Sequence, residues 1–194
     1  MVDTEKNIRA FLAIEPPENI LAEISRLQEK LKREISGKLS WTRPQSNHLT
    51  LKFFGDISAA DAENIGNAVK KQAAGVAPLM LKVEKLGVFP DWRRPRVLWL
   101  GTTGDTERLT VLQNKLEADF EQFGFPRENR PFRAHLTLAR IKIPQSAAGL
   151  EEAVKKLCNF SAGEFRATEL ILFQSKLQPQ GAIYTKLNTI PLGG

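Results

Sequence analysis

Residues 48–51 read HLTL, and residues 135–138 read HLTL again, in a chain that contains only two histidines. In a β-strand, alternate side chains point to the same face, so each histidine shares a face with the threonine two positions later. The leucines face the other way and suit a hydrophobic core. Because both histidines occur in this one setting, the repeat favours a function for the two polar pairs over packing alone.

The spacing of 87 residues between the two motifs extends to other parts of the chain. Arg9 in IRAFLAI, moved by 87 positions, falls on Arg96 in PRVLWLG, so an arginine and an apolar strand precede each histidine by the same 39 residues. The segment LKVEKLGVF falls near TELILFQSK in the same way. We therefore predict an internal duplication within a single domain over residues 1–194, with repeats at about 1–90 and 91–194.

A helix is predicted to follow each of these strands in the sequence, because apolar residues recur at helical spacing after a proline pair or a capping residue. The predicted helix starts lie at Pro16 and Pro17, Ser58, Asp105 and Ser146. Further strands are predicted at about 79–88, 165–174 and 182–188. Each half then has the order β-α-β-α-β. This order predicts an α+β fold of two similar lobes, related by a pseudo-twofold axis and packed together because no long linker separates them.

The composition is that of a folded globular protein, with 42% hydrophobic and 26% charged residues among 194. There is no apolar run long enough for a membrane span and no signal peptide, so a cytoplasmic protein is expected. The lone cysteine, Cys158, is predicted to be a small buried residue on a helix face. The formal net charge of +6 favours a polyanionic partner, most commonly a nucleic acid, although solvated surface charge is the alternative. The most pointed basic positions are Arg93, Arg94, Arg96, Arg127, Arg130, Arg133 and Arg140.

Two imidazoles and two hydroxyls on one surface suit phosphoryl transfer without a metal. One histidine can accept a proton while the other donates one, and the hydroxyls of Thr50 and Thr137 can donate hydrogen bonds to phosphate oxygens. Metal binding is the rival use of histidines. Two histidines without Asp, Glu or Cys at ligand spacing make a poor metal site, so no metal and no cofactor are expected.

The segments HLTLKFFG and HLTLAR, together with RAFLAIEPP, WTRPQSN, PRVLWLG and FRA, resemble the 2H phosphoesterase superfamily. They are most similar to its bacterial and archaeal branch, the RNA 2′,3′-cyclic phosphodiesterases, also called 2′-5′ RNA ligases. The resemblance covers nearly the whole chain. It implies two pseudo-twofold-related lobes, each an antiparallel sheet with helices on its outer side, and an active-site cleft between them.

The resemblance also implies the reaction and the roles of the histidines. An RNA-terminal 2′,3′-cyclic phosphate would be opened to a 2′-phosphate, with His48 donating a proton to the leaving 3′-oxygen. His135 would accept a proton from the attacking water. A 5′-hydroxyl in place of water would form a 2′-5′ linkage.

Phe53 and Arg140 each lie five residues after their histidine, so the duplication makes them equivalent. Strict alternation would turn both toward the leucine face, and a bend or bulge after the threonine is therefore required. We expect the ring of Phe53 and the guanidinium of Arg140 to flank the terminal base. The alternatives are a core phenylalanine and a phosphate-contacting arginine.

Two other functions remain open from the sequence. One is a phosphodiesterase that acts on a small cyclic nucleotide or on 2′,5′-oligoadenylate, and the other is a non-catalytic RNA-binding module. The basic charge favours RNA, and the two complete His-x-Thr pairs favour catalysis. A monomer is expected, because no predicted helix is apolar on all sides.

Overall fold

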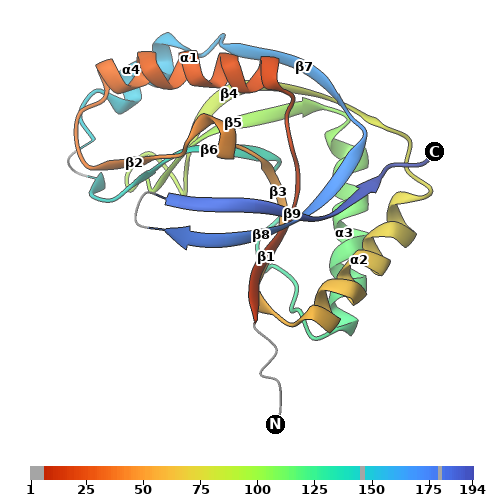
Figure 1. The fold of residues 1–194 in the computed structure, drawn as a ribbon. Coiled ribbons are helices and arrows are strands. Elements are labelled where there is room, and N and C mark those ends of the chain that lie inside the picture. The colour runs from red at the N-terminus through yellow and green to blue at the C-terminus, as the bar shows by residue number, and fades with distance from the viewer. Residues whose placement is uncertain (1–6, 145–146, 179–180) are drawn as a thin grey trace.

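The computed structural model describes residues 7–144, 147–178 and 181–194. These residues form a mixed α+β fold built on one antiparallel sheet (Figure 1). In chain order the elements are β1 Ile8–Ile14, α1 Glu18–Glu34, β2 Leu39–Trp41, the short 3₁₀ helix η1 Pro44–Ser46, β3 Leu49–Ile57, α2 Ala59–Ala73, β4 Leu79–Phe89, β5 Val97–Gly104, α3 Thr106–Gln122, β6 His135–Ile141, α4 Leu150–Lys156, β7 Ser161–Ala167, β8 Glu169–Gln178 and β9 Gly181–Pro191.

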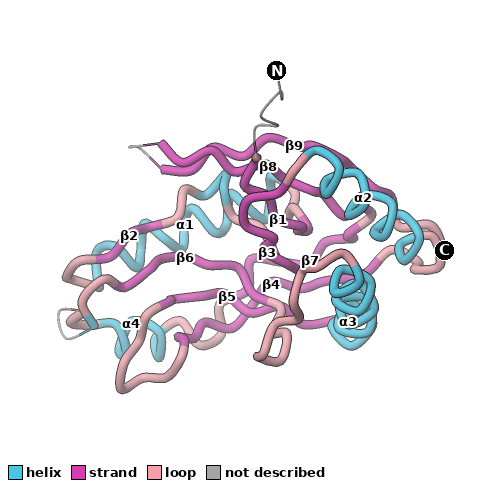
Figure 2. The backbone as a smooth tube through the Cα atoms, turned by 90° about the horizontal axis from the view of Figure 1, so that it is seen from below, coloured by secondary structure: helices cyan, strands magenta, loops and turns pink. Residues whose placement is uncertain are grey.

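The strand order is β7-β4-β5-β6-β3-β1-β8-β9, with β2 added to β6. Its centre lies between β3 and β6, the two strands that carry the HLTL motifs. We call β3, β1, β8 and β9 the β3 lobe, and β6, β5, β4 and β7 the β6 lobe. Helices α1 and α4 lie over the β6 lobe, while α2 and α3 lie beside the β3 lobe (Figures 1 and 2). The predicted two-lobe α+β architecture is confirmed.

The two lobes exchange strands. β4 comes from the first half of the sequence but pairs with β5 and β7 in the β6 lobe. β8 comes from the second half and pairs with β1 in the β3 lobe. The prediction of one strand at 165–174 was therefore wrong: the chain leaves β7 in one lobe and enters β8 in the other at Thr168, and periodicity alone does not reveal a change of partner.

The helix starts agree in part with the sequence predictions. Ser58 caps α2 in a capping box, because its Oγ accepts from the Asp61 amide at 3.1 Å and the Asp61 carboxylate accepts from the Ser58 amide at 2.9 Å. Asp105 precedes α3 but does not cap it; its carboxylate accepts from the Met80 amide instead, at 2.9 Å. Ser146 lies outside the described residues. The prediction for Cys158 was wrong, because α4 ends at Lys156 and the thiol beyond it is exposed.

The main hydrophobic core contains the leucines of both motifs, which are at most 4% exposed. A smaller cluster lies apart from it and is made of Phe11, Ala13, Ile171 and Phe173, with Tyr184 packed against them. This smaller cluster supports the motif face of the β3 lobe. In the part of the chain that the structure describes, no helix is both long and apolar enough to cross a membrane.

Candidate active site

β3 and β6 meet at the centre of the sheet, where the leucines that follow the two histidines pair with each other, Leu49 with Leu136. An antiparallel register centred there sets His48 across from Thr137. It sets Thr50 across from His135 in the same way. All four polar side chains are half-buried, whereas the motif leucines are buried. The two His-x-Thr pairs therefore share one face of the sheet, around the pseudo-twofold axis.

Each motif strand has a bulge directly after its threonine. In β3 the extra residue is Leu51. Its neighbours Thr50 and Lys52 pair with the adjacent residues Ala13 and Leu12 of β1, so Leu51 has no partner there. In β6 the extra residue is Leu138, at the equivalent position against β5. The bulges return Phe53 and Arg140 to the face of the histidines, as the sequence required, and both are exposed, Phe53 at 55%.

The register also corrects one detail of the duplication. Thr50 pairs with Ala13 of β1, and Thr137 pairs with Trp99 of β5, so these two strands are related by 86 positions instead of 87. Arg9 and Arg96 are therefore not structural equivalents. Their equal distance from the histidines is a coincidence of spacing.

A buried glutamine satisfies the backbone carbonyl at each bulge. The Gln113 amide in α3 donates to the Leu51 carbonyl at 3.3 Å, and the Gln28 amide in α1 donates to the Leu138 carbonyl at 3.0 Å. Both glutamines are at most 5% exposed. Because an unpaired buried carbonyl is costly, the Gln113 bond stabilises the bulge that directs Phe53. The Leu138 carbonyl also accepts from the Thr42 amide at 2.9 Å, so two donors hold the bulge that directs Arg140.

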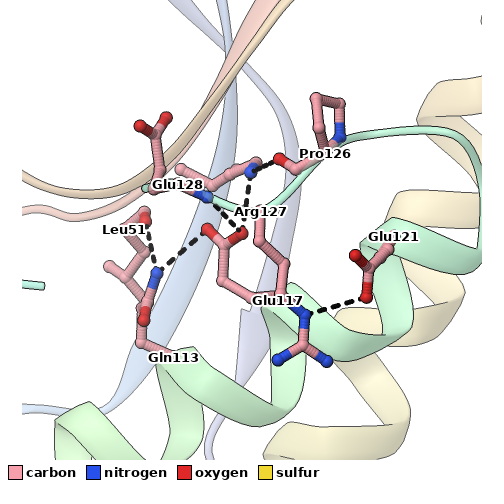
Figure 3. A network of polar contacts seen from close by, with 8 residues as sticks. Leu51, Gln113, Glu117, Glu121, Pro126, Arg127 and Glu128 are labelled. Atoms are coloured by element: carbon pink, nitrogen blue, oxygen red, sulfur yellow. Dashed lines mark hydrogen bonds and ion pairs between the residues drawn. The ribbon is translucent and has the colours of Figure 1, made fainter. Parts of the chain in front are cut away.

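A buried ion pair extends the network on the β3 side (Figure 3). The ammonium of Lys52 lies 2.8 Å from the Glu117 carboxylate, and the two side chains are 4% and 7% exposed. Lys52 also donates to the Pro126 carbonyl at 2.6 Å, and Glu117 accepts from the Gln113 amide at 3.0 Å. The network therefore ties the residue after the first bulge to α3 and to the segment that leads toward His135.

His48 is packed among aromatic rings. The Phe11 ring stacks on it at 4.5 Å between centroids, and the Tyr184 ring meets it edge-on at 5.2 Å. Burial lowers the pKa of His48 from 6.5 to about 4, although the Ser46 carbonyl and the charge of Glu15 act in the opposite direction. The ligand-free imidazole is therefore neutral at pH 7.

The ring of His135 forms a hydrogen bond with the backbone two residues earlier. Its Nδ1 lies 2.7 Å from the Arg133 carbonyl, which can only accept, so Nδ1 carries the proton and Nε2 of the neutral ring has a free lone pair. Phe89 meets the ring edge-on at 4.9 Å. Burial lowers the pKa of His135; the hydrogen bond to the Arg133 carbonyl acts in the opposite direction, and the charge of Arg140 lowers the pKa further. Both imidazoles are therefore mainly neutral at pH 7 in the ligand-free protein.

Arg140 connects the two sides of the site. Its charge lowers the pKa of His135. Burial raises the pKa of Tyr184, the residue that packs on His48, and the charge of Arg140 partly offsets that rise. Phe53 is linked to the same place, because its ring centroid lies 5.6 Å from that of Phe11. The structure thus brings the predicted residues onto one aromatic and basic surface.

Two hollows adjoin this surface. One of about 260 Å³ opens beside His48 and is bordered by Arg43, Asn47 and Tyr184. Another of about 430 Å³ begins at Phe53 and is bordered by Arg127 and Arg130. A larger one, of about 530 Å³, lies along α1 away from both histidines and has no connection with this chemistry. Across the described ranges, no three His, Cys, Asp or Glu side chains are grouped so that they could hold a metal ion.

The aromatic neighbours of the histidines could not be identified from the sequence. Tyr184 reaches His48 only because β9 pairs with β8, and β8 pairs with β1. Trp99 lies flat on the site side of β5 over Gly87, where an added Cβ would approach the indole to 2.2 Å. The glycine at that position is the only local signal for the ring above it.

Known proteins resemble this chain over almost its full length. The family model described as LigT like Phosphoesterase matches residues 14–99 and again residues 100–184. The chain is 36% identical over 185 residues to the RNA 2′,3′-cyclic phosphodiesterase of Methanothermobacter thermautotrophicus, covering 95% of this chain and 99% of that protein.

Two further comparisons agree with these. The RNA 2′,3′-cyclic phosphodiesterase of Aquifex aeolicus is 33% identical, with 97% of this chain and all of that protein (100%) covered. The crystal structure of TT0787 of Thermus thermophilus has a TM-score of 0.80 and 26% identity, covering 96% of this chain and 99% of that one. The double family match, the shared sequence and the shared fold lead to one conclusion: the chain belongs to the LigT-like phosphoesterase family.

Proposed function

We propose that this protein hydrolyses RNA-terminal 2′,3′-cyclic phosphate to a 2′-phosphomonoester. The observation that carries the proposal is the Leu49–Leu136 pairing, which sets two His-x-Thr pairs on one face about a pseudo-twofold axis. Such a face offers two proton-transfer groups and two hydroxyl donors around a single phosphate. The names of the relatives from M. thermautotrophicus and A. aeolicus support the same activity.

In the proposed reaction His135 acts as the base. Its Nε2 takes a proton from water, the water oxygen attacks phosphorus, and the bond from phosphorus to the 3′-oxygen breaks. His48 gives its proton to the departing 3′-oxygen, so the 2′-ester remains. Thr50 and Thr137 donate hydrogen bonds to the non-bridging oxygens.

The donor role requires that His48 be protonated when the substrate is bound. In the ligand-free protein its pKa of about 4 makes that form rare at pH 7. A bound cyclic phosphate brings a negative charge next to the ring, and such a charge raises the pKa of a histidine. The substrate therefore supplies part of the electrostatic environment in which His48 can act as an acid.

The reaction assigns no step to a metal or cofactor. The same site can run with a 5′-hydroxyl of a second RNA in place of water, and then forms a 2′-5′ linkage. We further propose that Phe53 and Arg140 flank the terminal base. Their common place on the histidine face, after matching bulges, supports this assignment.

The remaining parts of the proposal concern the setting of the enzyme. We propose that residues 1–194 act as one domain, with repeats at about 1–90 and 91–194. We also propose that it acts as a monomer in the cytoplasm.

The direct test is incubation of the protein with an RNA that ends in a 2′,3′-cyclic phosphate, with EDTA present. The expected product is the 2′-phosphomonoester. The His48→Ala and His135→Ala variants should each lose about 10²- to 10⁴-fold in turnover. A variant on the outer face of α1, Arg33→Gln, is the control and should keep the full rate. An unchanged rate in either histidine variant would falsify the two-histidine mechanism.

The same assay separates the alternatives. A protein that turns over a cyclic mononucleotide as well as the RNA, or prefers 2′,5′-oligoadenylate, would be a phosphodiesterase of small nucleotides. A protein that binds the RNA without product would be a binding module.

A further inference from the structure

The loop between β4 and β5, Pro90–Arg96, is basic and carries an exposed tryptophan. Trp92 is 45% exposed. The three arginines of the loop are all exposed, and none forms an ion pair within the described residues. They are Arg93, Arg94 and Arg96. The function proposed above has so far used none of these side chains.

Hydrogen bonds hold this loop in a defined shape. Its base is closed by the pairing of Phe89 with Val97 and by the Arg96 amide, which donates to the Phe89 carbonyl at 2.6 Å. The Asp91 carboxylate accepts from the amides of Arg93 and Arg94 at 2.8 and 3.1 Å. The one acidic group of the loop is thereby engaged with the backbone, and the arginine side chains extend from a fixed turn.

The loop adjoins the histidine face. Phe89 precedes it directly, and the ring of Phe89 lies 4.9 Å from that of His135. On the other strand of its base, the Arg96 carbonyl accepts from the Ile141 amide at 2.8 Å, at the end of the strand that begins with His135. The guanidinium of Arg133 lies 6.0 Å from the Phe89 ring and adds to the positive charge there.

The loop also lies close enough to the histidine face to contact an RNA whose end is bound there. Trp92 is three residues from Phe89, so its Cα lies within about 10 Å of that residue. A stacked strand advances by about 3.4 Å per nucleotide. Because the Phe89 ring contacts the His135 ring, the loop lies within a few nucleotides' length of the histidine face.

We propose that the Pro90–Arg96 loop binds the single-stranded part of the RNA next to its cyclic end, with Trp92 stacking on a base and Arg93 and Arg94 contacting phosphates. This inference rests on the proposed function, because it extends the same substrate beyond its terminal nucleotide. Arginine alone would fit any polyanion. An exposed indole beside the arginines favours an unpaired strand, since the bases of a duplex are not free to stack on a side chain.

Binding can be tested without turnover. A fluorescent single-stranded RNA of roughly eight nucleotides is titrated with protein and followed by fluorescence anisotropy. Trp92→Ala should weaken binding about 10-fold, and Trp92→Phe, which keeps a ring, should restore most of the loss. The Arg93→Gln/Arg94→Gln variant should weaken binding and lower the slope of log K against log salt by about 1.4, for two lost phosphate contacts. The control, Lys30→Gln/Arg33→Gln on α1, removes the same charge and should leave that slope almost unchanged.

Turnover separates this inference from the function it rests on. For a 2′,3′-cyclic mononucleotide, kcat/KM should be the same in wild type, Trp92→Ala and Arg93→Gln/Arg94→Gln. KM for the oligonucleotide should instead rise about 10-fold in Trp92→Ala. Equal losses on both substrates would overturn the proposal, because the loop would then act through Phe89 and His135. Unchanged oligonucleotide binding, or equally weakened binding of a duplex, would overturn it as well. If the wild type turned over neither substrate, the proposed function would fail, while the binding titration would still decide the role of the loop.

Discussion

Acidification should destabilise the protein through His48, and the size of the effect follows from the pKa of the buried ring. In the unfolded chain His48 binds a proton below pH 6.5, whereas in the folded protein it does so only near pH 4. Between these values the unfolded state binds more protons, so stability falls as the pH falls. The full difference corresponds to about 3 kcal/mol, and about 2.5 kcal/mol of it should be lost by pH 4.5. Above pH 6.5 the contribution is complete.

Urea unfolding of wild type and His48→Asn at pH 7.0 and pH 4.5 measures the loss in free energy of unfolding that is due to His48. Carboxylates also titrate in this interval, but they do so in both proteins, so the difference between the two losses isolates His48. The wild type should lose about 2.5 kcal/mol more than the variant. His135→Asn is the matched control and should still lose the part of its stability that depends on His48. Equal losses in wild type and His48→Asn would refute the argument from burial.

Proton NMR gives a second reading, because the chain has only two histidines. Each ring should give one titrating signal, and each variant assigns the other. His48 should titrate near pH 4, and saturating inorganic phosphate should raise its pKa. A pKa of 6.5 or above in the phosphate-free protein would contradict the desolvated environment seen around the ring.

Three more predictions follow from the buried network and the two imidazoles. Lys52→Met should cost about 3–5 kcal/mol in urea unfolding, because it leaves the Glu117 carboxylate buried without its cation, and Lys52→Met/Glu117→Leu should recover most of that loss; a double variant no more stable than the single one would contradict this. Gln113→Leu should cost about 1–3 kcal/mol and lower kcat, since the Leu51 carbonyl loses its partner, and full activity in this variant would mean that the bulge does not depend on it. The pH optimum of kcat/KM should lie below 6.5, because the pKa values of both histidines lie below 6.5 in the free enzyme. The pH optimum of kcat should lie higher, because the bound phosphate favours protonated His48. If steady-state kinetics gave the same optimum for both, the charge of the substrate would not raise the pKa of His48.

The sequence predicted the face that each motif presents and also the need for a bulge. Alternation assigned the leucines to the core, and the placement of Phe53 and Arg140 required an extra residue after each threonine. These features are local, so a pattern of a few residues suffices to predict them. The same reasoning misjudged residues 165–174, where one apolar stretch serves two strands in different lobes.

The supporting residues were beyond sequence reasoning for a different reason. Gln28 and Gln113 look like ordinary polar positions of amphipathic helices, and their role depends on which strand each helix covers. Tyr184 contacts His48 through two successive strand pairings that join distant segments. Such contacts depend on tertiary partners, which a single sequence does not reveal.

The exchange between the halves explains why neither copy of the motif could serve alone. The bulge after His48 is held by Gln113 and Glu117 from the second half, and the bulge after His135 is held by Gln28 from the first half. β8 from the second half likewise lies against β1, whose Phe11 stacks on His48. A duplication that left each half self-contained would let the two histidines shift independently. Here each half supports the motif of the other, so the relative position of the two imidazoles is fixed by the same contacts that hold the lobes together.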